Sequence, residues 1–201
     1  MMDLVLASAS PRRAELLRQI ELPFSVEPST DPEPLPDERD PEAFTVYSAQ
    51  CKARSVLSLL RNRGAATNAL IIGADTVVCI DGLILGKPAD PAQAAQMLAR
   101  LSGRQHRVYT GLSVVCAQRE SSGCEITSVQ MKALSQQDID TYVSSGEPLD
   151  KAGSYGIQGR AARFIESIEG CYYNVVGLPL ARLCALIEDM GHDVVSAIDT
   201  D

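Results

Sequence analysis

The chain has 201 residues, of which 45% are hydrophobic and 22% are charged, as in an ordinary globular protein. With no Trp and three Phe, it has few residues for an aromatic stacking surface, so we expect no nucleic-acid partner. The 18 basic and 26 acidic residues give a net charge of −8, so a phosphate ligand would need a local cluster of basic side chains.

The cysteines and the apolar segments indicate the class of protein. The six cysteines are far apart and form no CxxC pair, which argues against a zinc site. The first residues lack the basic and long apolar regions of a signal peptide, and no apolar stretch reaches the ~18 residues that span a bilayer. We therefore expect a cytoplasmic protein with no membrane partner.

The first third of the chain predicts a strand and two helices. Residues 4–7 are a short apolar run typical of a buried strand, and Ser10 and Pro11 then predict the N-cap and first position of a helix. The Pro- and acid-rich residues 27–41 indicate an exposed loop, whose length suggests a functional flap or mobility. A second helix is expected over residues 41–64.

The middle of the chain predicts a hairpin followed by a helix. Residues 70–80 form a central strand, Asp81 and Gly82 form the turn, and residues 83–85 form the returning strand. The next helix is expected over residues 90–103, with Asp90-Pro91 at its start.

The last part of the chain predicts two more strands and two more helices. The strands are expected at residues 108–115 and 125–132, a capping box at 135–138 opens a helix, and the final helix covers 179–190. We expect one domain over residues 1–201. Its two lobes would share a mixed central sheet flanked by helices, which is an α/β fold and not a strict βαβ array.

Arg12 and Arg13 are the first sign of a functional site. Both fall in the first turn of a predicted helix, where the positive end of the helix dipole makes a basic residue mildly unfavourable. An anion bound there would reverse the sign of that effect, and the preceding Ser8 and Ser10 could add hydroxyl groups. The alternative is that the arginines only form a solvated face.

Asp75 is the second sign, because it lies in the middle of an otherwise apolar or small strand. A carboxylate buried there without a partner would cost several kcal/mol, so Asp75 should bind a cation or ligand or lie at the edge of a cleft. A catalytic role would be to hold Mg²⁺ on phosphates or to activate water. A structural role, accepting hydrogen bonds from a nearby loop, stays open.

Three further residues are weaker candidates. Lys87 follows the hairpin within a Gly-Lys-Pro sequence, and Lys52 lies on the second predicted helix; each could reach a phosphate, although lone lysines are commonly surface residues. Gln158 lies in the glycine-rich segment 151–159, and its amide can both donate to and accept from the edge of a pyrimidine. The segment is not a Walker A sequence, so it equally suits a tight connection.

Taken together, several motifs resemble the Maf proteins. The resemblance covers residues 3–190, with order and spacing preserved. It rests on Leu6-Ala7-Ser8-Ala9-Ser10-Pro11-Arg12-Arg13, Gly73-Ala74-Asp75-Thr76-Val77-Val78, Gly86-Lys87-Pro88, Leu101-Ser102-Gly103-Arg104, His106-Arg107-Val108-Tyr109-Thr110-Gly111, the segment 151–159 and Asn174-Val175-Val176-Gly177-Leu178-Pro179.

The resemblance implies a Maf/ITPase-like fold with a cleft between two lobes. It also implies hydrolysis of nucleoside triphosphates to the monophosphate and pyrophosphate, with Mg²⁺ or Mn²⁺ as cofactor. Asp75 would be the proton acceptor and a metal ligand. Ser8, Arg12, Arg13, Lys52 and Lys87 would bind the phosphates, and Arg12, Thr76 and Gln158 would influence base choice. The Gly-Ile-Gln-Gly sequence resembles the branch that acts on dTTP and UTP, and members have been associated with arrest of cell division.

Two departures from the family pattern leave alternatives open. Where members carry an acidic pair after the first helix, this chain has Asp31-Pro32-Glu33, so either Asp31 or Glu33 could be the second metal ligand. Tyr47 stands where members have an arginine five residues before Lys52. A nucleotide-binding regulator of division that has lost catalysis, a metal-dependent phosphomonoesterase, and modified pyrimidine substrates are the alternatives. A homodimer is expected by analogy.

Overall fold

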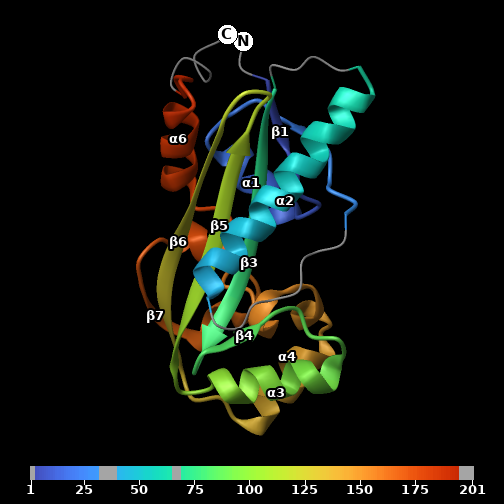
Figure 1. Ribbon diagram of the computed structural model, residues 1–201. Helices are drawn as coiled ribbons and strands as arrows, with labels where there is room; N and C mark the ends of the chain where they lie inside the picture. The colour runs from blue at the N-terminus through green and yellow to red at the C-terminus, as the bar shows by residue number, and fades with distance from the viewer. Residues whose placement is uncertain (1–2, 32–39, 65–68, 195–201) are drawn as a thin grey trace.

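The computed structural model describes residues 3–31, 40–64 and 69–194, which build a seven-stranded mixed sheet with helices around it (Figure 1). Six strands lie in the order β2-β1-β3-β5-β6-β7, and β4 pairs with β3. The strands are β1 (Leu4–Leu6), β2 (Ser25–Val26), β3 (Leu70–Ile80), β4 (Leu83–Leu85), β5 (Gln105–Val115), β6 (Glu120–Met131) and β7 (Ile165–Glu169). β1, β2 and β3 are parallel, and the other pairings are antiparallel.

Strand β3 has two different partners along one of its edges. β5 pairs with residues 71–79 on one side, while on the other side β1 pairs with residues 70–72 and β4 with residues 78–80. Residues 73–77 therefore lie between the end of β1 and the start of β4. The polar residues of β3, Asp75 and Thr76, fall within this interval.

Helices cover both faces of the sheet and one end of it (Figure 1). The α-helices are α1 (Pro11–Gln19), α2 (Pro41–Asn62), α3 (Pro91–Leu101), α4 (Gln136–Ser144), α5 (Tyr172–Val176) and α6 (Leu180–Asp189), and the 3₁₀ helices are η1 (Glu147–Asp150), η2 (Ala152–Ser154) and η3 (Arg160–Phe164). Side chains of α1 and α6 share one apolar cluster with Leu70, Ile72 and Ala74, whereas α2 packs with Ile71 on the other face. Successive residues of β3 therefore face different helices.

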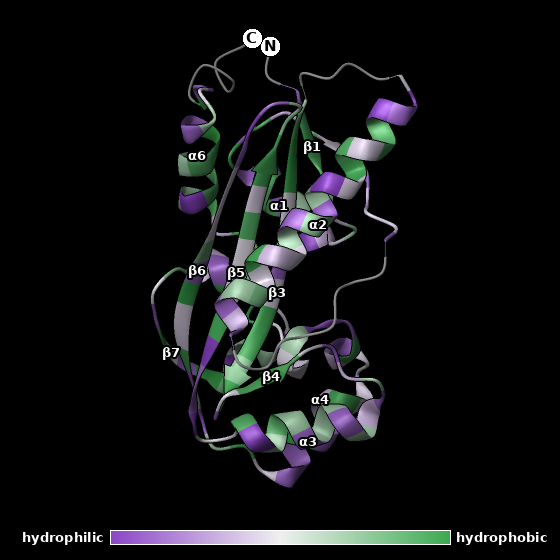
Figure 2. Cartoon of the chain, viewed as in Figure 1, coloured by the Kyte–Doolittle hydropathy of each residue, from purple (hydrophilic) through white to green (hydrophobic). Residues whose placement is uncertain are grey.

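A separate apolar cluster fills the end of the molecule that contains β4, α3 and α4. It joins Leu98 and Leu101 of α3 to Tyr142 of α4 and Phe164 of η3. In Figure 2 the strands β3 and β5 are predominantly hydrophobic, while the helices mix hydrophilic and hydrophobic residues. Apolar burial thus explains why the sheet lies inside and the helices cover it.

Two glycines let α2 approach the sheet closely. A Cβ at Gly73 of β3 would collide with the backbone carbonyl of Ala49, and a Cβ at Gly111 of β5 would collide with the backbone of Thr45. Gly111 lies directly opposite Asp75 in the β3–β5 register. The two glycines therefore determine how closely α2, and with it Lys52, approaches Asp75.

The α/β class and the mixed sheet flanked by helices are confirmed. The hairpin with its turn at Asp81-Gly82 and the capping box of Ser135 and Asp138 are found as predicted. None of the described helices is both long and apolar enough to cross a bilayer. The division into one domain with two lobes remains a prediction, and so does a flap in the loop 27–41, because residues 32–39 lie outside the described part.

The strands β2 and β7, the helix α5 and the three 3₁₀ helices lie in segments for which no helix or strand was expected. The strands β5 and β6 also begin earlier than predicted, at Gln105 and Glu120. Residues 120–123 have the sequence Glu-Ser-Ser-Gly, which is typical of a turn, yet they pair with residues 112–115 of β5. Pairing with a buried neighbouring strand overrides the weak local preference.

Candidate active site

A pocket of about 840 Å³ lies beside residues 73–77 of β3. Its lining comes from residues 7–13 before and at the start of α1, from residues 29–31, from α2, β3 and β5, from β4 and the segment after it, and from residues 147–159 and 175–177. The sequence-predicted residues that line it are Ser8, Arg12, Arg13, Asp31, Lys52, Asp75, Thr76, Lys87 and Gln158. Glu33 falls outside the described residues. Folding thus brings together residues that are up to 150 positions apart in the sequence.

The pocket is locally basic in an acidic protein. Five basic side chains line it, namely Arg12, Arg13, Lys52, Lys87 and Lys151, against the four acids Asp31, Asp75, Glu147 and Asp150. The chain as a whole carries −8. This local cluster is the feature that a phosphate ligand would require.

Asp75 is paired with Lys52. The Nζ atom of Lys52 donates to Oδ1 of Asp75 at 2.6 Å, and each side chain is 14% exposed. The pair joins α2 to β3 next to Gly111, whose missing side chain lets α2 pack closely against the sheet. This contact explains how a carboxylate is accommodated in an apolar strand while one side of it still faces the pocket.

Arg13 binds to the scaffold around the pocket. Its guanidinium donates to Ser8 Oγ at 3.0 Å, to Thr76 Oγ1 at 3.1 Å, and to the carbonyl oxygens of Ala74 at 3.0 Å and Gly177 at 2.8 Å. Ala74 belongs to the interval of β3 between β1 and β4. Arg13 therefore satisfies a carbonyl at this interval and fixes two hydroxyl groups that line the pocket.

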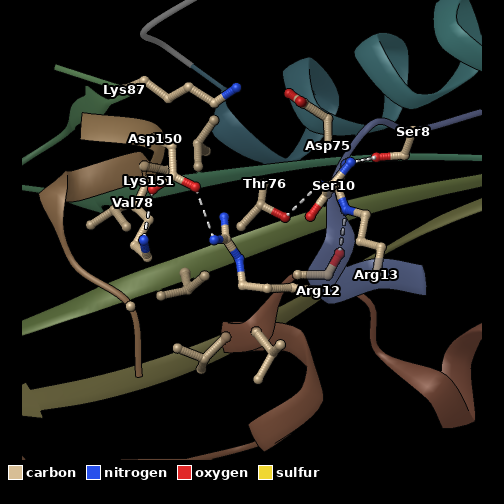
Figure 3. A pocket seen from close by; sticks show the side chains of 18 of the residues that line it. Ser8, Ser10, Arg12, Arg13, Asp75, Thr76, Val78, Lys87, Asp150 and Lys151 are labelled. Atoms are coloured by element: carbon tan, nitrogen blue, oxygen red, sulfur yellow. Dashed lines mark hydrogen bonds and ion pairs between the residues drawn. The ribbon is translucent and has the colours of Figure 1, made fainter. Parts of the chain in front are cut away.

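Arg12 points to a different partner. Its Nη1 atom lies 3.0 Å from Oδ2 of Asp150 in η1, and Oδ1 of the same carboxylate lies 2.6 Å from Nζ of Lys151 (Figure 3). Burial raises the pKa of Asp150, but the hydrogen bonds and charges of Lys151 and Arg12 outweigh burial, so the pKa lies below its ordinary value. Asp150 is thus a carboxylate between two cations at neutral pH.

The start of α1 offers backbone groups as well as side chains. Ser10 holds the N-cap position and Pro11 the first helical position, as predicted, but the Ser10 hydroxyl makes no capping hydrogen bond. The first turn contains no acidic residue. Ser10 lines the pocket, so this helix terminus presents its positive end there, which suits an anion.

Lys87 and Gln158 approach the pocket from segments with exposed side chains. Lys87 follows β4, and its ammonium extends into the space beside β3 (Figure 3). Gln158 lies between Ile157 and Gly159, in the glycine-rich segment. Ile157 belongs to the apolar cluster of α1 and α6, so the segment is anchored on one side of Gln158.

The carboxylates of the pocket fit a cation that is shared with phosphates. Asp75 and Asp31 both line it, and Mg²⁺ is usually bound by one or two carboxylates together with phosphate oxygens. Within residues 3–31, 40–64 and 69–194 there is no group of three or more His, Cys, Asp or Glu side chains that could hold a metal ion. A cation held by these two carboxylates and by phosphate oxygens of a substrate would fit this lining.

Three charged residues of the pocket lining were not predicted as site residues: Glu147, Asp150 and Lys151. The adjacent opposite charges of Asp150 and Lys151, directly before the glycine-rich segment, were the available signal. Tyr47 is 53% exposed on α2 and is not among the lining residues, so the departure at this position does not place a tyrosine in the pocket.

His106 of β5 is buried beside Tyr155. It is 2% exposed, lies outside the lining, and its Nε2 is 2.7 Å from the hydroxyl of Tyr155. Burial lowers its pKa from 6.5 to about 4.

Comparison with known proteins gives this pocket a family context. The model of the Maf-like proteins matches residues 3–190. The chain is 50% identical over 196 residues to the dTTP/UTP pyrophosphatase of Moorella thermoacetica, covering 96% of this chain and 98% of the relative. It is 48% identical over 194 residues to that of Symbiobacterium thermophilum, covering 96% and 97%. The Ham1 protein of Staphylococcus aureus is 15% identical with a TM-score of 0.52, covering 94% of this chain and 99% of that chain, which is a likeness of fold alone.

Proposed function

The chain belongs to the Maf family, and we propose that it hydrolyses dTTP and UTP to the monophosphate and pyrophosphate. The observation that carries this proposal is the gathering of Asp75 and five basic side chains in one pocket. Five basic side chains suit the several charges of a triphosphate better than those of a phosphomonoester. The relatives named dTTP/UTP pyrophosphatase support the choice of pyrimidine substrates.

Asp75 is the proton acceptor in the proposed mechanism. It orients a water molecule and accepts its proton as the water oxygen attacks the α-phosphorus. The bond from the α-phosphorus to the bridging oxygen breaks, and pyrophosphate leaves. Lys52, 2.6 Å from Oδ1, holds the carboxylate in place while its charge faces the phosphates. Positioning and charge stabilisation are the main requirements of phosphoryl transfer, so no covalent nucleophile is needed.

The phosphates are held by the start of α1 and by two lysines. Ser8 and Arg12 approach them from the α1 side, and Lys52 and Lys87 from the other side of the pocket. Arg13 adds charge to this group and, through its hydrogen bonds, keeps Ser8 in position. Donors fixed before the reaction stabilise the charge that develops on the leaving pyrophosphate.

Asp75 and one acid of the loop after the first helix, Asp31 or Glu33, would hold Mg²⁺ or Mn²⁺. Asp31 lines the pocket, which supports it as the second ligand. When bound, the cation supplies charge neutralisation for the phosphate oxygens. Base choice is assigned to Arg12, Thr76 and Gln158. The proposal also includes a cytoplasmic homodimer that acts on normal or modified pyrimidine nucleotides.

The test is pyrophosphate release from a panel of nucleoside triphosphates with Mg²⁺. Wild-type protein should release pyrophosphate and monophosphate from dTTP and UTP, and Asp75→Asn should lose about 10³-fold in kcat, the scale of a general base. Asp81→Asn is the matched control, because Asp81 also pairs with a cation, Arg104 at 2.6 Å, but on the surface away from the pocket.

The products separate the alternative functions. Orthophosphate in place of pyrophosphate would identify a phosphomonoesterase. Binding without turnover across the panel would identify a nucleotide-binding regulator. Its role in cell division would then be examined with Asp75→Asn in cells. Wild-type turnover in Asp75→Asn would refute the assignment of the base.

A further inference from the structure

The 3₁₀ helix η1 places two carboxylates in the pocket at its two ends, Glu147 and Asp150. The proposed mechanism uses neither of them. Carboxylates that face a triphosphate would repel it, so their presence in the lining calls for another explanation. Their contacts supply one, because Asp150 binds Arg12 and Glu147 binds the backbone two residues after Gln158.

Asp150 holds Arg12. Its Oδ2 atom lies 3.0 Å from Nη1 of Arg12, while Oδ1 lies 2.6 Å from Nζ of Lys151. The Lys151 ammonium also donates to the backbone oxygen of Glu147 at 2.7 Å, which ties the carboxylate to the rest of η1. The side chain of Asp150 is 61% exposed, so the ion pair adds little to stability. What it determines is the direction of the Arg12 guanidinium.

Glu147 holds the turn that carries Gln158. Its carboxylate accepts hydrogen bonds from the backbone N–H of Arg160 at 3.1 and 3.2 Å and from the hydroxyl of Tyr142 at 3.0 Å. A Cβ at Gly159 would collide with this carboxylate, so Gly159 has to be a glycine for the contact to form. Gln158 is therefore next to a backbone segment that Glu147 fixes.

Together these contacts make η1 a link between the two sides of the pocket. Arg12 comes from α1 and Gln158 from the glycine-rich segment, 146 positions later, and their relative placement depends on one four-residue element. Uracil and thymine present a ring N–H between two carbonyl oxygens, a pattern that a guanidinium donor and a side-chain amide can read together. Such reading requires both groups to be fixed relative to each other.

We propose that Asp150 and Glu147 are positioning residues for base selection, Asp150 by orienting Arg12 and Glu147 by fixing the turn of Gln158. This inference rests on the proposed function, because it concerns which base the same pocket accepts. Neither carboxylate touches the reacting atoms. Their loss should reduce discrimination between uracil and cytosine nucleotides more than it reduces the rate of the chemical step.

The test measures kcat and KM for UTP and CTP in matched variants. Asp150→Ala and Glu147→Ala should each lower the ratio of kcat/KM for UTP over CTP about tenfold, mainly through KM for UTP, with kcat within about threefold of wild type. Glu147→Gln should keep the wild-type ratio of kcat/KM for UTP over CTP, since its amide oxygen still accepts from the Arg160 N–H. Asp81→Asn, which removes the carboxylate of a surface ion pair, should keep it.

A second readout separates this inference from the proposed activity. Calorimetric titration with the non-hydrolysable α,β-methylene analogues of UTP and CTP measures base discrimination without turnover. Loss of discrimination in Asp150→Ala would support the inference even if no nucleotide is hydrolysed, an outcome that would refute only the activity.

Three outcomes would overturn the inference. The first is wild-type discrimination in both alanine variants. The second is tighter binding of UTP and CTP alike by Asp150→Ala, which would identify Asp150 as a competitor for phosphate and not as a positioning residue. The third is a wild-type protein that does not distinguish the two bases in either assay. Circular-dichroism melting of each variant shows that a change does not come from unfolding.

Discussion

The ammonium of Lys52 lies 2.6 Å from the carboxylate of Asp75, joining the middle of α2 to the middle of β3. Each side chain is 14% exposed, so both charges are partly withdrawn from water and depend on each other. The pair also borders the pocket, where a triphosphate would bring further negative charge. Removing either partner therefore affects both the pocket and the fold.

Lys52→Met should lower kcat/KM for dTTP by about 100-fold, because a phosphate donor is lost and Asp75 loses the cation that orients it. Steady-state kinetics measures this effect. Arg54→Met is the matched control on the same helix: Arg54 pairs with Glu120 at 2.8 Å but is 53% exposed and outside the pocket. Equal losses in both variants would show that ion pairing on α2, and not the pocket, is responsible.

Gly111→Ala should destabilise the protein by about 3 kcal/mol or more, because the new methyl group collides with the backbone of Thr45 and has to push α2 from the sheet. Urea unfolding measures the change. Gly123→Ala is the control in the neighbouring strand, since a Cβ there would meet the Arg182 side chain only at 3.7 Å or more. A Gly111→Ala protein with wild-type stability would contradict the packing argument.

The sequence predicted the elements whose signals are local. Pro11, Asp40 and Asp90 mark helix starts, and Asp81-Gly82 marks a hairpin, because capping and turn chemistry depend on a few neighbouring residues. The start of β6 has no such signal. Its Glu-Ser-Ser-Gly sequence becomes a strand only because β5 lies beside it.

The residues of the candidate site also divide into those with a local sequence signal and those without one. The basic residues and Asp75 could be selected because they are unusual in their local setting, an arginine pair in a first helical turn or a carboxylate in an apolar strand. Asp150 and Glu147 are ordinary acids in a polar segment. Their importance lies in partners such as Arg12, 138 positions away from Asp150, which only the folded chain brings near.

Arg13→Met should cost more stability than Arg12→Met, by about 2 kcal/mol. Arg13 donates to the backbone oxygens of Ala74 and Gly177, and its loss leaves these partly buried acceptors unsatisfied. Arg12 pairs instead with the exposed carboxylate of Asp150, a contact that adds little. Parallel urea unfolding of both variants makes the comparison. Equal losses would mean that the Arg13 hydrogen bonds do not stabilise the fold.

The buried His106 should make the folded state sensitive to mild acid. Its pKa is lowered from 6.5 to about 4 because burial disfavours the charged ring, so the unfolded chain binds a proton that the folded chain does not between these two values. Stability is therefore fully retained above about pH 6.5 and falls as the pH decreases toward 4. The shift corresponds to a loss of about 3 kcal/mol at most.

Comparison of wild type with His106→Gln isolates this contribution from that of the carboxylates. The glutamine can still bond to the hydroxyl of Tyr155 but does not titrate. Urea unfolding at pH 7.5 and pH 4.5 should show a larger loss for the wild type than for the variant, by about 2 to 3 kcal/mol. Equal losses would mean that His106 takes up its proton equally in the folded and unfolded states, and that its burial does not oppose protonation.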